Sequence, residues 1–238
     1  DNLPRLVEAT NNIAPTGVKL TIDSVMRQSI LRSVERAIEF NNSAELQLLY
    51  NDLNERVNKY ADIIITASHI ENVNVRGRII EYLITEEDSL LKTRLIEEIN
   101  REYANFPRFK TENFLGDYKR DFDKYKTETD IKTKIIVLKS NPKAYNIDKL
   151  LEFLASDKGV FLFFFVGIDK ISIVNTTLVS VFQEDLIEDT ALLKHWAGRN
   201  SRGVTQFLGL TLNKLLMEKS THINRNKAVS FLETLMSL

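Results

Sequence analysis

The feature that most constrains this 238-residue chain is an uninterrupted apolar run at residues 160–166, with the sequence VFLFFFV. Seven residues are far fewer than the roughly 20 that a membrane-spanning helix needs. A short apolar run of this kind is typical of a buried strand, and residues 159–168 form the most apolar strand that we expect. Such a strand must be covered on its faces, so we predict a central sheet with helices packed against it.

Helical periodicity dominates the segments before this strand, whereas extended segments and helices surround it. The helix predicted after residue 146 begins at an Asn146 cap. The fold class is therefore α/β: a central mixed β-sheet flanked by helices, with a helical N-terminal region at residues 1–70 followed by a core unit at residues 71–238. The predicted helices are 22–40, 45–65, 76–84, 88–103, 184–196, 211–219 and 224–236, and the predicted strands are 114–125, 129–138, 159–168 and 170–182.

Composition excludes several classes of protein. The 32 basic and 33 acidic residues give a net charge of −1, which rules out a uniformly basic nucleic-acid coat. The chain has no cysteine, so disulfides, zinc–thiolate sites and thiol nucleophiles are absent. This fits a reducing compartment, and we expect a cytoplasmic protein with no membrane partner. The chain begins at Asp1 instead of Met, which leaves open that it is a fragment.

The sharpest chemical signal is the Asp130-Ile131-Lys132 tripeptide on a predicted strand. Alternate residues of a strand share a face, so Asp130 and Lys132 should point together. A carboxylate can hold a hard divalent cation, and an ammonium group can stabilise charge that develops on a phosphate. The cation needs a second carboxylate, and either Asp117 or Asp121 on the preceding strand can supply it.

This pattern resembles the PD-(D/E)xK nuclease superfamily, especially type II restriction endonucleases. In that family an Asp on one strand of a hairpin is followed, on the next strand, by Asp or Glu, any residue, and Lys. Gly116-Asp117 and the Asp130–Lys132 tripeptide are similar to this, with Gly116 where the family has proline. The segment 76–81, which ends in Glu81, resembles the helix on which many members carry a Glu. The resemblance covers residues 75–182 in order and spacing.

The resemblance implies a restriction-endonuclease-like fold and a Mg²⁺-dependent hydrolase, part of a restriction system, that cuts double-stranded DNA at specific sites. It implies that Asp117 and Asp130 are metal ligands, with Glu81 as a further catalytic carboxylate, and that Lys132 orients or deprotonates the attacking water. It also implies a homodimer, because cutting both strands of a two-fold duplex site needs two active sites.

A second signal lies near the C-terminus, where residues 194–227 contain seven Lys or Arg and one acidic residue. Such a stretch is typical of phosphate contact, and Arg, Asn and Gln are the side chains that read base edges. We therefore predict that Arg199, Asn200, Arg202 and Gln206 bind DNA.

Two other functions remain open from the sequence: a non-catalytic nucleic-acid-binding module that uses this basic region, and a helical interaction protein. The three histidines show no zinc-ligand spacing, and no glycine-rich phosphate loop is present.

Overall fold

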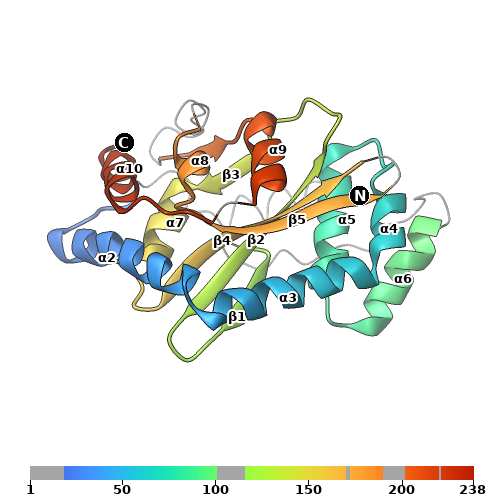
Figure 1. Ribbon diagram of the computed structural model, residues 1–238, viewed down its shortest axis with the longest axis horizontal. Coiled ribbons are helices and arrows are strands. Elements are labelled where there is room, and N and C mark those ends of the chain that lie inside the picture. Colours follow the sequence, from blue (N-terminus) through green and yellow to red (C-terminus); the bar gives the residue numbers. More distant parts are fainter. Residues whose placement is uncertain (1–18, 101–115, 170–171, 190–201, 220) are drawn as a thin grey trace.

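The structure is a computed structural model that describes residues 19–100, 116–169, 172–189, 202–219 and 221–238. It is an α/β fold whose main sheet is mixed and has the strand order β1-β2-β4-β5 (Figure 1). A second, two-stranded sheet pairs β3 with β6. The strands are β1 Tyr118–Asp121, β2 Lys126–Ile135, β3 Lys143–Asn146, β4 Gly159–Ile168, β5 Ile173–Ser180 and β6 Val204–Gln206.

Helices flank the main sheet and enclose two hydrophobic cores, one on each face. In Figure 1, α4, α5 and α6 group at one end of the molecule, and α2, α7 and α10 group at the other. The first core contains side chains of α2, α7, α8, α9 and α10, and the second contains side chains of α3, α4, α5 and α6. The helices are α2 Ser24–Asn41, α3 Ala44–Lys59, α4 Ala61–Ala67, α5 Val73–Thr85, α6 Ser89–Asn100, α7 Ile147–Leu154, α8 Glu184–Ile187, α9 Gly209–Glu218 and α10 Arg225–Ser237.

Strand β4 separates the two cores, and all ten of its residues are buried. Phe161, Phe163 and Phe165 face the first core, whereas Leu162 and Phe164 face the second. Alternation along the strand explains this division, because successive side chains point to opposite faces. The apolar run seen in the sequence is therefore a strand covered on both faces.

The strand register fixes the surroundings of β2. Strand β2 runs parallel to β4, with Asp130 opposite Phe163, and α7 lies on the connection between them. On its other side β2 is antiparallel to β1, and the last paired residues are Tyr118 and Thr129. Among the described residues, no strand pairs with β2 on this side beyond Thr129. The segment that starts at Asp130 thus lies at an edge of the sheet.

The described part of the N-terminal region packs into both cores. Val34 of α2 belongs to the first core, and Phe40 at the end of the same helix belongs to the second. Arg36 of α2 donates hydrogen bonds to the carbonyl oxygens of Leu154, Ser156, Asp157 and Gly159. This guanidinium group ties α2 to the turn between α7 and β4.

The observed elements follow the predicted order, with several differences in their extent. The helix expected at 45–65 is interrupted at Tyr60, which leaves helical geometry and separates α3 from α4. The first hairpin strand is shorter than expected, and the helix expected from residue 184 spans only Glu184–Ile187 before the undescribed residues begin at 190. Strands β3 and β6 were not predicted. No described helix has the length and apolar character needed to cross a membrane.

Candidate active site

Three carboxylates from three separate segments converge beside the part of β2 that starts at Asp130. Asp130 lies on β2, Asp117 immediately precedes β1, and Glu81 lies on α5. One oxygen atom of each lies within 4.8 Å of those of the other two. We call Glu81, Asp117 and Asp130 the acidic cluster. Asp121, the other carboxylate considered from the sequence, is exposed at the far end of β1 opposite Lys126.

Backbone contacts of the β1–β2 hairpin place Asp117 in this cluster. The Asp117 amide donates to the Thr129 carbonyl oxygen over 2.8 Å, and the Asp117 carboxylate accepts from the Ile131 amide, also over 2.8 Å. The approach depends on Gly116, because a Cβ atom at this position would lie 2.9 Å from the Thr129 nitrogen and 3.0 Å from its oxygen. The proline of the nuclease pattern, which carries a Cβ, is therefore excluded here by the close approach of two backbones.

Helix α5 directs Glu81 toward the hairpin because the opposite face of the helix is buried. The Asn72 side chain caps the helix by accepting hydrogen bonds from the amides of Asn74 and Val75. Ile80 and Leu83 insert into the second core. This packing fixes the rotation of the helix and leaves Glu81 directed at the hairpin.

Lys132 provides the positive charge of the site. Its Nζ lies 3.0 Å from Asp130 Oδ2, and the two side chains are only 17% and 10% exposed. The two side chains meet on one side of β2, as strand alternation predicts. Burial lowers the pKa of Lys132, but the charges of Asp130, Asp117 and Glu81 outweigh it, so the pKa is raised overall. Lys132 is therefore held in its charged form.

Full ionisation of the acidic cluster would give more negative charge than Lys132 balances, and the pKa values of two of its members are raised accordingly. Burial raises the pKa of Glu81 to about 8, with a further contribution from the charge of Asp117 and opposing ones from Lys132 and Arg78. Burial also raises the pKa of Asp130 well above its ordinary value, and Lys132 only partly opposes this. Three close carboxylates in a poorly solvated position are expected to gain from a bound cation, because the cation replaces the missing counter-charge.

A polar network that could not be found from the sequence anchors β1 to α3. Asp52 of α3 accepts hydrogen bonds from the Tyr118 hydroxyl over 2.5 Å, from Arg56 Nε over 3.1 Å and from Arg120 Nη1 over 3.3 Å. The Arg56 guanidinium also lies 4.9 Å from the centre of the Tyr118 ring. Since Tyr118 follows Asp117, this network holds the strand that presents a member of the acidic cluster.

Of the four residues predicted to bind DNA, the structure describes Arg202 and Gln206. Arg202 is 3% exposed. Its guanidinium contacts the Asp148 carboxylate at 2.6 Å and donates to the carbonyl oxygens of Leu20 and Met236. The burial and these bonds give Arg202 an internal role in place of the predicted DNA contact. Gln206 lies half-buried on β6, and Arg199 and Asn200 lie outside the described residues.

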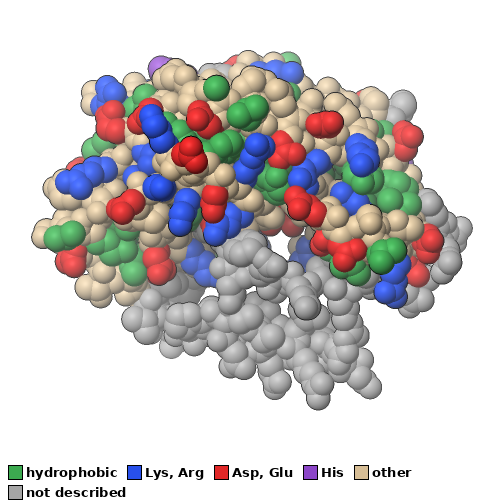
Figure 2. Space-filling model, turned by 90° about the horizontal axis from the view of Figure 1, so that it is seen from below, with side chains coloured by type: hydrophobic (Ala, Val, Ile, Leu, Met, Phe, Trp, Pro, Cys, Tyr) green, Lys and Arg blue, Asp and Glu red, His purple; other side chains and the backbone are tan. Residues whose placement is uncertain are grey.

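Four of the five described basic residues at positions 194–227 form ion pairs with carboxylates of the protein. Lys214 pairs with Asp185, Arg225 with Glu35, and Lys227 with Glu184 and Glu188. Figure 2 shows the face seen from below, turned away from α9 and α10 at the top of Figure 1, and on that face too basic and acidic side chains are interspersed. A count of charged residues within positions 194–227 missed these ion pairs because the acidic partners come from other segments of the chain.

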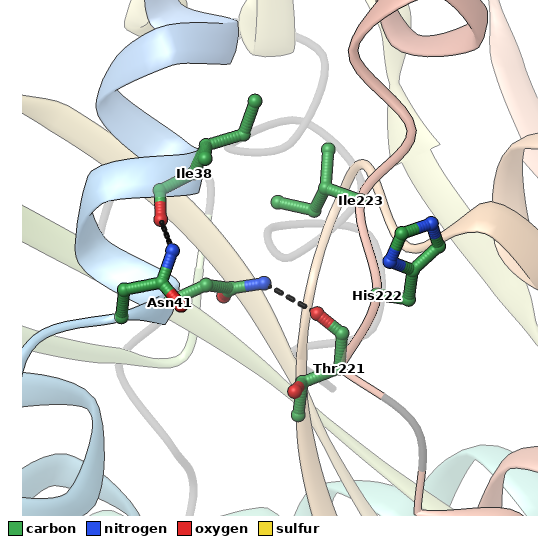
Figure 3. A pocket seen from close by; sticks show the side chains of 6 residues that line it. Ile38, Asn41, Thr221, His222 and Ile223 are labelled. Atoms are coloured by element: carbon green, nitrogen blue, oxygen red, sulfur yellow. Dashed lines mark hydrogen bonds between the residues drawn. The ribbon is translucent and has the colours of Figure 1, made fainter.

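A separate cavity of about 360 Å³ lies between the end of α2 and the segment that precedes α10 (Figure 3). Asn41 donates a hydrogen bond to the Thr221 carbonyl oxygen at 2.6 Å across its wall, and His222 lies at its rim. Its described lining contains no carboxylate and none of the residues predicted from the sequence. The acidic cluster is therefore the stronger candidate for a reactive centre.

Comparisons with known proteins assign no family to the chain. It matches no protein-family model, and it matches no curated protein at a significant level. The chemistry of the acidic cluster therefore has to indicate the function.

Proposed function

We propose that the chain is a Mg²⁺-dependent endonuclease that hydrolyses phosphodiester bonds in double-stranded DNA at specific sites, in the manner of a type II restriction enzyme. The observation that carries the proposal is the convergence of Glu81, Asp117 and Asp130 within 4.8 Å, with Lys132 Nζ 3.0 Å from Asp130. The resemblance to the PD-(D/E)xK nucleases implied this set of four residues. The pairing of β4 with β2 after α7 is compatible with the restriction-endonuclease-like fold that we propose.

The donor set fits Mg²⁺, because this hard cation prefers oxygen ligands and usually takes one or two protein carboxylates together with water. Asp117 and Asp130 would hold it, and Glu81 would complete the acidic side of the site. Bound there, Mg²⁺ would activate a water molecule and stabilise negative charge on the scissile phosphate. The raised pKa of Glu81, about 8, and that of Asp130 support the fit, because burial disfavours their charged forms, neighbouring carboxylates add to the shift, and a bound cation would favour ionisation.

Lys132 would orient the attacking water or stabilise the phosphate. Asp130 fixes the position of Nζ at 3.0 Å, and the raised pKa of Lys132 favours the charged ammonium form. A charged ammonium group donates hydrogen bonds and stabilises developing negative charge, whereas a general base must first lose its proton. Of the two roles that the resemblance implies, positioning and charge stabilisation are thus better supported than proton abstraction.

A homodimer and a cytoplasmic location belong to the same proposal. Two copies related by a two-fold axis would present one acidic cluster to each strand of a two-fold site. The alternative of a binding module that uses the C-terminal basic region is less well supported, because Arg202, Lys214, Arg225 and Lys227 are engaged within the protein.

The test combines plasmid cleavage with DNA binding. Purified protein is incubated with supercoiled plasmid in Mg²⁺ and in EDTA, and binding to duplex DNA is measured in Ca²⁺. Mg²⁺-dependent cutting that disappears in Asp130→Asn but persists in Asp121→Asn supports the proposal, and sequencing the ends gives the site and stagger. Binding without cutting would indicate a binding module, and neither activity would indicate an interaction protein.

A further inference from the structure

We propose that the turn of α5 formed by Gly77 and Arg78 is a phosphate-binding site for the nucleic-acid strand that is cut. The inference deepens the proposed function and rests on it. We call these two residues the α5 phosphate turn.

Helix geometry places this turn beside the acidic cluster. Gly77 and Arg78 precede Glu81 by four and three residues, so all three lie on one side of α5. Side chains of a helix lean toward its N-terminus and cover the preceding turn. The Glu81 side chain therefore leans over Gly77 and Arg78, and a phosphate held at the acidic cluster would lie against them.

Gly77 has no explanation in the packing of the protein. Glycine in the interior of a helix is unfavourable compared with alanine. A Cβ atom at Gly77 would meet no described atom within 4 Å, in contrast to Gly116, where it would lie 2.9 Å from Thr129. The described residues therefore leave room for a Cβ atom at Gly77. A glycine here would suit the binding of a nucleic-acid strand. Without a side chain at position 77, the sugar-phosphate backbone of the strand can approach the helix surface closely.

Arg78 supplies a positive charge that forms no ion pair with a described residue. Its side chain is exposed and forms no hydrogen bond or ion pair with a described residue, whereas neighbouring Arg76 donates to the Ile70 carbonyl oxygen. The charge of Arg78 acts on Glu81. A guanidinium group presents a fork of donors that matches a phosphate. Negatively charged carboxylates repel a polyanionic substrate. The Arg78 guanidinium group next to them would offset this repulsion by attracting the phosphates of the substrate.

Substitutions at the two positions separate this role from a structural one. Gly77→Ala and Gly77→Leu should keep or raise the melting temperature, because both residues favour a helix over glycine. Gly77→Ala should bind Mg²⁺ like the wild type in calorimetry, because its Cβ atom would meet no described atom within 4 Å, and the same titration shows whether the longer Gly77→Leu side chain disturbs Glu81. Plasmid cleavage should fall with side-chain size, and Gly77→Leu should lose at least about a hundredfold through displacement of the strand.

Arg78→Ala should weaken binding of a fluorescein-labelled duplex about tenfold and reduce the slope of log affinity against log salt by about one. Arg78→Lys should recover part of this affinity, because it keeps the charge. Arg94→Ala is the matched control, since Arg94 is also exposed on a helix, α6, and has no hydrogen bond or ion pair to a described residue. It should bind and cut like the wild type.

The outcomes distinguish the inference from the proposed function. Wild-type protein that cuts, together with a Gly77→Leu variant that cuts equally well and an Arg78→Ala variant of unchanged affinity, would overturn the phosphate site and leave the nuclease standing. Wild-type protein that binds the duplex through Arg78 but never cuts would overturn the nuclease and retain the site. A Gly77→Leu variant with a lower melting temperature than the wild type would contradict the conclusion that no described atom crowds this position. Absence of any DNA binding would overturn both the phosphate site and the nuclease.

Discussion

At the scale of single residues, the surroundings of Lys132 decide its chemistry. A lysine on a hairpin is usually exposed and inexpensive to replace, within about 0.5 kcal/mol. The observed side chain is mostly buried between carboxylates, so removal of its charge leaves Asp130 without its ion-pair partner. Such a loss costs roughly 3–5 kcal/mol when the pair is fully buried, and somewhat less for this partly exposed pair.

We predict that Lys132→Met abolishes cutting but binds Mg²⁺ at least as tightly as the wild type. Methionine preserves most of the volume, and removal of a positive charge next to the acidic cluster lowers the repulsion that a cation meets. Calorimetry in Mg²⁺ and plasmid cleavage measure the two effects. Wild-type cutting by this variant would exclude Lys132 from catalysis.

The two upstream carboxylates should differ sharply. Asp117→Asn should weaken Mg²⁺ binding and abolish cutting, because it removes a charged oxygen from the acidic cluster. Asp121→Asn should change neither, because Asp121 lies exposed at the far end of β1. Equal Mg²⁺ affinities for the two variants would show that Asp117 is no ligand.

At the scale of elements, the β1–β2 hairpin controls the site through its closest backbone approach. Gly116→Ala should destabilise the protein by roughly 1–3 kcal/mol, because the new methyl group collides with the backbone of Thr129. It should also weaken Mg²⁺ binding, because the displaced strand carries Asp117. Urea unfolding and calorimetry test the two effects. Gly77→Ala is the matched control, and it should lose no stability.

The network that joins β1 to α3 gives a pH dependence. Burial raises the pKa of Asp52, but hydrogen bonds from Tyr118 and Arg56 and the charge of Arg120 outweigh it, so its folded-state pKa is lowered. A lowered pKa adds stability above the unfolded value of about 3.9, and this stability is lost as the pH falls through the folded value. The advantage of the wild type over Asp52→Asn should therefore shrink as the pH falls below about 4. Urea unfolding at each pH measures it, and a constant difference would contradict the assignment.

Elements with their own periodic signal were predictable, whereas those defined by distant partners were not. Strand β4 and the Asn146 cap of α7 follow from local sequence, because apolar runs and cap residues act within a few positions. Strands β3 and β6 are short and exist because they pair with each other. The break at Tyr60 has no glycine or proline to announce it, and Lys92 of α6 contacts its ring at 3.9 Å.

The same distinction applies to the site. The Asp130–Lys132 pair follows from strand alternation, and the resemblance supplied Asp117 and Glu81. The internal role of Arg202 depends on Asp148, Leu20 and Met236, which are distant in sequence. A count of charges along a segment cannot reveal such partners, because ion pairs form in space.

At the scale of the whole molecule, two cores share one sheet. Leu53→Ala in the second core and Leu232→Ala in the first should each cost about 2–5 kcal/mol, because both side chains are fully buried. Since β4 contributes to both cores, each variant should lower the midpoint of one common transition in circular dichroism and fluorescence. Two separated transitions in either variant would show that the cores unfold independently.

The order in which the chain folds determines when the acidic cluster is complete. Asp117 and Asp130 meet through a local hairpin, but Glu81 reaches them only after α5 has docked on the sheet. Contacts between distant segments form after local ones, because closing a long loop is entropically costly. A nascent or half-folded chain therefore lacks the complete acidic cluster, and the proposed reactivity toward nucleic acid would be withheld until α5 has docked.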